Sequence, residues 1–385
     1  MGSERTVVVR PPDSREATWA AKHVALAVAL SGCASAGGPA PALVPTAIDR
    51  PFVAGYHVYW AGEAWSGYPL DMLDELHLFE IEVGEEGGVL DGHGWPTGWL
   101  SLVARAVDAG VQVVPTVSMH DADAFEALFA DAARIERLVG TVVDLLVIEP
   151  RLSGLHLDFE VFRPVDAAAR DGFTAFVAEL AAELRAGFPG RSLSVFVLAF
   201  DDDDVYNERA LGRLADYLVL QGYDYHGLAS PNAGPVGALR GWGRLNWEHV
   251  VERFESFGVP RRKLVMGLPL YGYEWSVASE EPGAESVAPG VIVPYAAGPD
   301  VVPELPRAQE RAQRHGLRRD PVSGSPYYVF RLPSGWVQGW FEDEESLAAK
   351  IEFVRARGLG GVAFFPLAYG TPELFEALRE ALAGR

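Results

Sequence analysis

Residues 153–160 read SGLHLDFE, a stretch in which apolar and ionisable side chains alternate. A period of two is typical of a β-strand, so the stretch predicts a strand with one apolar and one ionisable face. On the ionisable face Asp158 and Glu160 lie about 6 to 7 Å apart, so their negative charges repel each other. One carboxyl group therefore keeps its proton to a higher pH. An acid beside an anion is the pairing that cleaves glycosidic bonds.

The same spacing also fits a strand end that is held by salt bridges, because the two carboxylates do not reveal their partners. A resemblance to a known family favours a catalytic role for the two carboxyl groups. Residues 153–160 resemble the Asp-Gly-x-Asp-x-Asp-x-Glu signature of glycoside hydrolase family 18, the chitinase-like family, with Gly154, Asp158 and Glu160 at matching positions. Ser153 and His156 stand where that family usually has Asp.

Eight short apolar runs alternate with helical segments between residues 51 and 369, which is the pattern of parallel β/α units. Eight is the strand number of the (β/α)8 TIM barrel, an α/β fold. The predicted strands are residues 52–58, 75–83, 111–117, 154–160, 192–199, 216–223, 263–270 and 360–367.

One gap, between Tyr273 and Glu342, is too long for a structureless loop. It is rich in Pro and Gly and contains strand-like pieces at residues 327–332 and 335–340. We therefore expect a small α+β subdomain inserted after strand seven, at about residues 276–340. The resemblance implies that such an insertion forms one wall of the substrate cleft.

Three further segments resemble the same family, in the right order, so that the similarity covers most of residues 52–369. They are residues 221–227 (QGYDYHG), continued by PNAGP at 231–235, residues 263–275 (KLVMGLPLYGYEW), and residues 340–367. Four segments are a far more specific signal than one motif.

The resemblance implies a role for each matching residue. Glu160 would be the general acid, and Asp158 would orient the substrate's N-acetyl group and stabilise positive charge. Tyr223 would donate a hydrogen bond to the acetamido oxygen, and Asp224 and Tyr271 would bind the same sugar. These roles describe substrate-assisted retaining hydrolysis of glycans that contain β-linked N-acetylglucosamine, chitin-like or of the peptidoglycan type.

Other candidate residues come from departures and from aromatic side chains. His156 replaces an Asp behind Asp158, where we expect it to donate a hydrogen bond to Asp158 or, as an imidazolium, to lower the pKa of Asp158 and hold it ionised. Gln221 stands where Met is usual, and Phe365 where the family often has the Trp of the sugar-binding floor. The aromatic residues on loops and strand ends, which suit sugar faces, include Tyr56, Trp60 and Trp275.

The composition sets limits on partners. The 385 residues carry a net charge of -21, which opposes binding to nucleic acid or to anionic lipid through a basic face. We expect a monomer that binds a neutral or cationic glycan without a cofactor or metal. The only cysteine, Cys33, can form no intrachain disulfide.

Cys33 closes the sequence Leu-Ser-Gly-Cys after a short apolar run, and this sequence resembles the lipobox of bacterial lipoproteins. We therefore expect a lipoprotein signal at residues 1–33, a flexible Pro-rich tether at 34–48 and the catalytic barrel at 49–385. The expected location is the cell envelope, with the lipid as the contact to the membrane, and otherwise outside the cell.

Two other functions stay open. A non-catalytic glycan-binding lipoprotein could use the same barrel. A metal-dependent barrel hydrolase would need a convergence of ligands, for which the candidates are His57, His120, His156, Asp158 and His226. No His-x-His pair lies on the first strand, which argues against the metal-dependent class.

Overall fold

The computed structural model describes residues 50–296 and 305–384. Eight parallel strands form a closed sheet in the order β1-β14-β8-β7-β6-β5-β4-β2, and β2 pairs with β1 to close it. The strands are β1 Phe52–Val58, β2 Glu75–Val83, β4 Gln112–Met119, β5 Gly154–Phe159, β6 Ser192–Val197, β7 Tyr217–Leu220, β8 Leu264–Pro269 and β14 Gly361–Phe365. The predicted (β/α)8 barrel is confirmed. Several strands end earlier than expected, so Glu160, Gln221 and Tyr223 lie in the loops that follow them.

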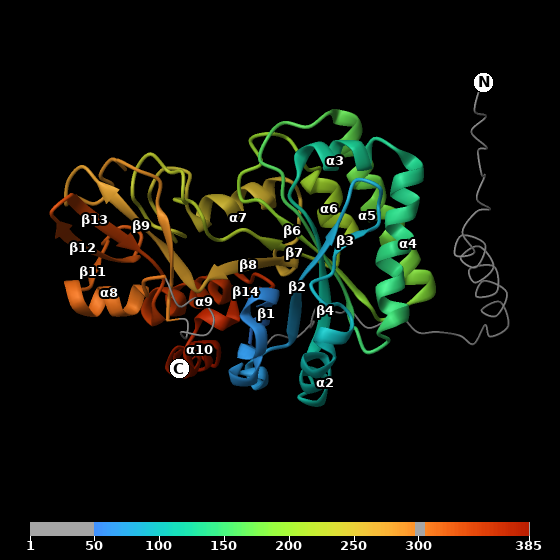
Figure 1. Cartoon of the computed structure of the whole chain (residues 1–385), viewed down its shortest axis with the longest axis horizontal. Helices are drawn as coiled ribbons and strands as arrows, with labels where there is room; N and C mark the ends of the chain where they lie inside the picture. The colour runs from blue at the N-terminus through green and yellow to red at the C-terminus, as the bar shows by residue number, and fades with distance from the viewer. Residues whose placement is uncertain (1–49, 297–304, 385) are drawn as a thin grey trace, which may run out of the picture. The chain divides into compact units, whose positions relative to one another are not determined.

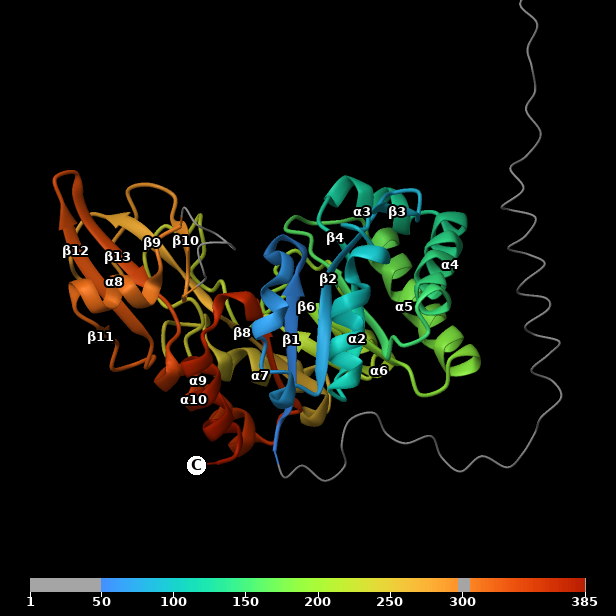
Figure 2. The ribbon, with the colours of Figure 1, turned by 60° about the horizontal axis from the view of Figure 1, so that its bottom comes forward.

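The strands alternate with helices that lie outside the barrel (Figures 1 and 2). The helices are α2 Leu100–Asp108, α3 Ala122–Phe129, α4 Ala132–Ile148, α5 Ala167–Gly187, α6 Glu208–Leu214, α7 Trp247–Ser256, α9 Glu344–Arg357 and α10 Pro372–Leu382. A short strand, β3 Val89–Asp91, pairs antiparallel with β2. Side chains of Asp121, Asp131, Asn246 and Thr371 cap the first turns of α3, α4, α7 and α10. Each cap satisfies a backbone N–H that the helix itself leaves free.

An aromatic cluster fixes the outer face of β5. The ring of Phe159 lies 5.6 Å from that of Phe129 on α3 and 5.4 Å from that of Phe173 on α5. These side chains are almost completely buried. The burial of each one stabilises the fold by on the order of 2 kcal/mol, because its apolar surface is removed from water. Because neighbouring residues on a strand face opposite sides, this packing turns Asp158 toward the barrel interior.

Gly154 lets β5 approach β6 closely. A Cβ atom at this position would lie 2.1 Å from Oγ and 2.4 Å from the carbonyl oxygen of Ser192. Every residue other than glycine would therefore push the beginning of β5 away from β6. The glycine of the signature thus has a packing reason that is separate from the carboxylates.

A second, antiparallel sheet lies in the chain between β8 and α9. Its order is β10-β9-β13-β12-β11, formed by β9 Tyr271–Val277, β10 Val291–Pro294, β11 Arg318–Arg319, β12 Pro326–Leu332 and β13 Gly335–Trp340. Helix α8 Ala308–His315 packs on β12. The sheet begins at Tyr271, earlier than the expected position 276, because β9 follows β8 almost without a loop.

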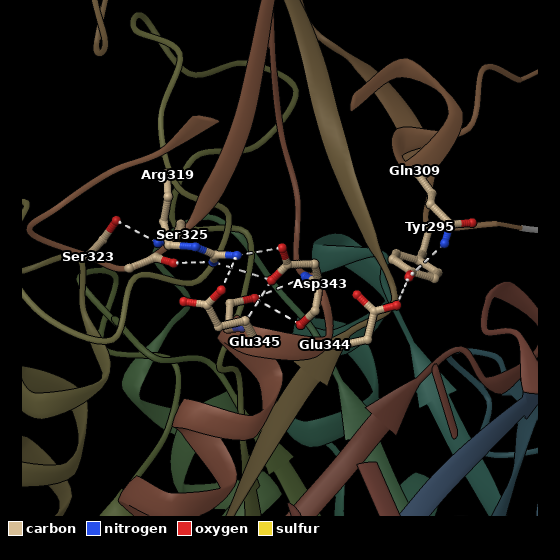
Figure 3. A network of polar contacts seen from close by, with 10 residues as sticks. Tyr295, Gln309, Arg319, Ser323, Ser325, Asp343, Glu344 and Glu345 are labelled. Carbon is tan, nitrogen blue, oxygen red and sulfur yellow. Dashed lines mark hydrogen bonds and ion pairs between the residues drawn. The ribbon is translucent and has the colours of Figure 1, made fainter. Parts of the chain in front are cut away.

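Helix α9 is joined to this sheet through polar contacts around its first turn (Figure 3). Asp343 caps the helix by accepting from the N–H of Ser346 at 3.0 Å, and Ser346 Oγ accepts from the N–H of Asp343 at 2.9 Å. Arg319 on β11 binds Asp343 at 2.7 Å and Glu345 at 3.0 Å. The helix start is therefore held by its own capping box and by the second sheet together.

A buried ion pair joins α9 to the residue that follows β13 by two positions. Lys350 Nζ lies 2.5 Å from Glu342 Oε1, and both side chains are no more than 2% exposed. Burial lowers the pKa of Lys350 and raises that of Glu342, while the opposite charge of each partner works against these shifts. The Lys350 ammonium also lies 5.6 Å from the centre of the Trp247 ring. Removal of one partner would leave the other as an uncompensated buried charge.

We predict that Lys350→Met lowers the free energy of unfolding by about 3 to 5 kcal/mol, because Glu342 then has no cationic partner. Urea unfolding followed by circular dichroism measures the change. The matched control is Glu352→Gln on the same helix, which breaks the exposed Arg355–Glu352 pair and should cost less than about 1 kcal/mol. Equal stability of the two variants would contradict the prediction.

The expected signal, tether and lipidated Cys33 lie outside the described residues. Within the part of the chain that the structure describes, no helix has the length and apolar character needed to cross a membrane.

Candidate active site

Two carboxyl groups mark the carboxyl end of β5. Asp158 is the inward residue next to the end of the strand and is 4% exposed. Glu160 follows the strand, its N–H donates to the carbonyl oxygen of Met119 at 3.0 Å, and its side chain is 20% exposed. The hydrogen bond continues the pairing of β4 with β5 by one residue. It keeps Glu160 at the barrel mouth, where active sites of this fold gather.

Burial and mutual repulsion favour the protonated forms of this pair. Burial raises the pKa of Glu160 to about 7, against a lowering effect of His120 and with a further rise from Asp224 and Glu80. Burial, followed by the charge of Glu160, raises the pKa of Asp158 well above its usual range. Glu160 therefore exchanges its proton near neutral pH, which is the range in which a general acid works best.

A histidine that was considered only as a metal ligand lies beside Glu160. His120 follows β4, and its Nδ1 lies 4.0 Å from Glu160 Oε1. Its Nε2 donates to Glu80 Oε2 on β2 at 3.1 Å. Burial lowers the pKa of His120, but the bond to Glu80 and the charges of Asp158 and Glu160 outweigh it and raise the pKa to about 9. An imidazolium therefore stands in the site, although at position 120 and not at position 156.

The interpretation of His156 as a cation beside Asp158 is wrong. Its Nε2 forms a hydrogen bond of 2.9 Å with the Tyr56 hydroxyl and its Nδ1 one of 2.8 Å with Ser194 Oγ. Burial, with the neighbouring His77, lowers the pKa of His156 well below 6.5, so the ring is neutral. His156 holds together the polar interior of the barrel.

That interior continues on the neighbouring strands. The His77 ring centre lies 4.3 Å from that of His156, and His77 Nε2 forms a hydrogen bond of 2.8 Å with Glu75. The Tyr217 hydroxyl donates to the same Glu75 oxygen. Side chains from β1, β2, β5, β6 and β7 thus form a buried polar layer below the carboxyl pair.

The loop after β7 brings Tyr223 and Asp224 to the same end of the barrel. Asp224 has a left-handed backbone with φ of 58°, which Asp tolerates better than most residues. Its Oδ1 accepts hydrogen bonds of 2.9 Å from both Tyr271 and Tyr273. Burial raises the pKa of Asp224 to about 6, while these two bonds lower it. Tyr273 was not predicted; it lies on the same face of β9 as Tyr271, two residues away.

An aromatic cluster surrounds Phe365 at the end of β14. The Phe365 ring centre lies 5.4 Å from those of Tyr56 and Phe79, 6.2 Å from that of Tyr223 and 6.4 Å from that of Tyr271. The Tyr223 ring is nearly parallel to it, at an angle of 12°. Burial raises the pKa of Tyr223 well above 10, so its hydroxyl keeps its proton and remains a hydrogen-bond donor.

The remaining residues that the sequence predicted for substrate binding differ in how exposed they are. Trp275 is fully buried and donates to the carbonyl oxygen of Gly227, so its predicted contact with substrate is wrong. Tyr56 is 2% exposed, and its ring packs edge-on against Phe365, so its direct contact with substrate stays a prediction. Trp60 is 38% exposed and packs edge-on against Phe79, where a ligand can reach it. The backbone N–H of Gln221 continues the sheet by donating to Val197.

The candidate metal ligands do not converge. His57 bonds to the Tyr68 hydroxyl, His226 bonds to the carbonyl oxygen of Pro235, and His156 is held as described above. Within the described ranges no group of three or more His, Cys, Asp or Glu side chains has an arrangement that could hold a metal ion. Three of the five candidate ligands thus have other partners, while His120 and Asp158 lie at the same end of the barrel.

A family model described as glycosyl hydrolases family 18 matches residues 102–370, which is more than half of the chain. The chain belongs to glycosyl hydrolases family 18. The matched range contains all the carboxylates of the site except Glu80, and it includes the second sheet.

The chain is also similar to individual curated proteins. The chain is 29% identical over 241 residues to a Bacillus subtilis protein provisionally described as a sporulation-specific glycosylase, a match over 60% of this chain and 51% of that protein. The chain spans about half the length of the first curated relatives that it matches.

Two solved structures show the same fold at low sequence identity. A class V chitinase of Nicotiana tobaccum in complex with NAG4 has a TM-score of 0.74 at 17% identity and covers 86% of this chain and 99% of its own. A chitinase-like agglutinin of Robinia pseudoacacia has a TM-score of 0.72 at 19% identity, with the same coverage of both chains.

We predict that His156→Leu lowers the free energy of unfolding by about 2 to 4 kcal/mol, because the buried hydroxyls of Tyr56 and Ser194 both lose a hydrogen-bond partner. His156→Gln, which keeps polar atoms at this place, should cost less. Since the imidazole is already neutral, His156→Gln should also leave the pH dependence of any Glu160-dependent reaction in place. Thermal and urea unfolding of both variants provide the measurement. A Leu variant as stable as the native chain would refute the role of His156 in the polar layer.

Proposed function

We propose that this chain hydrolyses glycans that contain β-linked N-acetylglucosamine, by substrate-assisted catalysis with retention of configuration. The observation that carries the proposal is the pair of Asp158 and Glu160 at the end of β5, with the pKa of Glu160 raised to about 7. At neutral pH a large share of Glu160 is therefore a carboxylic acid that can donate a proton. Family membership supports the reaction class.

The proposed first step cleaves the glycosidic bond without a nucleophile from the protein. Glu160 donates its proton to the leaving glycosidic oxygen while the acetamido oxygen of the substrate attacks the anomeric carbon. Asp158 accepts from the acetamido N–H and stabilises the positive charge of the oxazolinium. Among the described residues no hydrogen-bond partner reaches Asp158 Oδ1, which leaves this acceptor for the substrate.

In the second step the Glu160 carboxylate removes a proton from water, and the water oxygen attacks the anomeric carbon and opens the oxazolinium. Two displacements at one carbon return the original configuration. Tyr223 keeps its proton and donates to the acetamido oxygen, and Asp224 with Tyr271 binds the same sugar. Phe365 with its neighbouring rings forms the apolar floor against which the sugar packs.

The substrate class is proposed from the chemistry of the site and from the relatives. The described catalytic end is lined by carboxylates and aromatic rings, which suits a neutral glycan. The resemblance to a sporulation-specific glycosylase adds peptidoglycan-type polymers, and the likeness to a chitinase bound to NAG4 adds chitin-type polymers. Incubation with chitooligosaccharides and with peptidoglycan, followed by mass spectrometry of the products, separates the two.

We predict that Glu160→Gln lowers the rate of hydrolysis by roughly 10²- to 10⁴-fold while the fold and glycan binding persist. The amide has nearly the shape of the acid but cannot donate the required proton. Rates on the best substrate, circular dichroism and calorimetric binding measure the three properties. Unchanged hydrolysis by the Gln variant would refute the assignment of the acid.

The second candidate is a glycan-binding protein without catalysis. The specific observation in its favour is the shared fold with a chitinase-like agglutinin. A binding protein would take up N-acetylglucosamine oligosaccharides with the same affinity in the native chain and in Glu160→Gln, and it would release no product from any of them.

We also propose that the chain acts at the cell envelope, anchored through a lipid on Cys33. The support is the Leu-Ser-Gly-Cys sequence at residues 30–33 after an apolar run. Cys33→Ser should move the protein out of the membrane fraction and remove the lipid mass from the amino terminus. The same fractionation, with intact masses that differ by no more than the exchange of sulfur for oxygen, would contradict the anchor.

A further inference from the structure

We propose that His120, held by Glu80, is a positioning residue that stabilises the Glu160 carboxylate formed when the acid gives up its proton. The inference rests on the proposed function, because it assigns a further residue to the same reaction. It concerns Glu80 on β2 and His120 directly after β4, whereas the carboxyl pair lies at the end of β5.

The geometry fixes the imidazole between two carboxyl groups. Nε2 donates to Glu80 Oε2 at 3.1 Å, and Nδ1 on the opposite side of the ring lies 4.0 Å from Glu160 Oε1. Glu80 is on β2 with a side chain that is 9% exposed, so its carboxylate has few water molecules and needs a charged partner. The bond to Glu80 orients the ring so that the second N–H faces Glu160.

The charges around the ring favour its cationic form. The ionisable groups that face it are Glu80 from β2, Asp158 from β5 and Glu160 from the loop after β5. Asp224, from the loop after β7, adds a negative charge toward Glu160, and the neighbouring Tyr223 is neutral. Three carboxyl groups thus act on one imidazole, Asp224 adds to the negative charge at Glu160, and a neutral ring would leave their repulsion unopposed.

The consequence for catalysis concerns the acid strength of Glu160. When its proton moves to the leaving glycosidic oxygen, a carboxylate appears among three other carboxyl groups. An imidazolium 4.0 Å away offsets this repulsion and makes Glu160 a stronger acid. In the second step the same carboxylate takes a proton from water, and a pKa near the working pH suits both steps.

The test replaces the cation and follows the pH dependence. His120→Gln keeps a polar side chain but removes the charge, and we expect the alkaline limb of the kcat/KM profile to move upward by about 1 pH unit. The optimum rate should fall by up to about tenfold, since one pKa unit is one tenfold step in acid strength. His120→Arg restores a cation and should return the limb toward its native position. His315→Gln, at the end of helix α8 and away from the carboxyl pair, is the matched control and should leave the limb unchanged.

A direct titration decides the inference without a substrate. The side-chain carboxyl carbons of 13C-labelled glutamate are followed by NMR in the native chain and in His120→Gln, with Glu160→Gln to assign the Glu160 signal. A higher pKa of Glu160 in His120→Gln supports the inference. Coincident titration curves, or the same curve for the Gln and Arg variants, overturn it. Absence of hydrolysis by the native chain would refute the proposed function and leave this titration valid.

Discussion

The structure depends on the opposite demands of the two faces of β5. On the outer face Phe159 is locked among Phe129 and Phe173, and the strand cannot rotate without exposing that aromatic cluster to water. On the inner face Asp158 is then forced into a nearly closed barrel, with Glu160 just beyond it. Apolar packing on one side of a strand thus supplies the free energy that holds two carboxyl groups where they are unstable as anions.

The rest of the barrel interior contains polar side chains near the two buried carboxyl groups. Above β5 the carboxyl groups retain protons or face the imidazolium of His120, and below them neutral His156 bonds to Tyr56 and Ser194. A uniformly apolar interior would leave Asp158 without any polar neighbour. The charges of Asp158 and Glu160 act on Tyr56, which bonds to His156, so the functional end of the barrel and its polar centre are coupled through charge.

Much of this could be predicted from local patterns. The alternation in residues 153–160 and the eight buried runs reflect the strand period and the burial of parallel strands, so they revealed the barrel and placed Glu160 at its mouth. The states of the histidines could not be predicted, because each depends on a partner that is distant in the sequence. Glu80 is 40 residues from His120, and Ser194 is 38 residues from His156. The predicted contact of Trp275 with substrate was wrong for a related reason. The sequence of a strand does not show which of its two faces is covered by other segments of the chain.

The buried polar layer has a consequence for how such barrels diverge. Glu75, His77, Tyr217, His156, Tyr56 and Ser194 come from five strands, and each one completes the hydrogen bonds of another. A single exchange at any of these positions passes through an intermediate with an unpaired group in the interior. The positions are therefore expected to change together during evolution. Related chains should fall into discrete groups, with His156 accompanied by one set of partners and an Asp at this position by another, and hybrids between the groups should fold poorly.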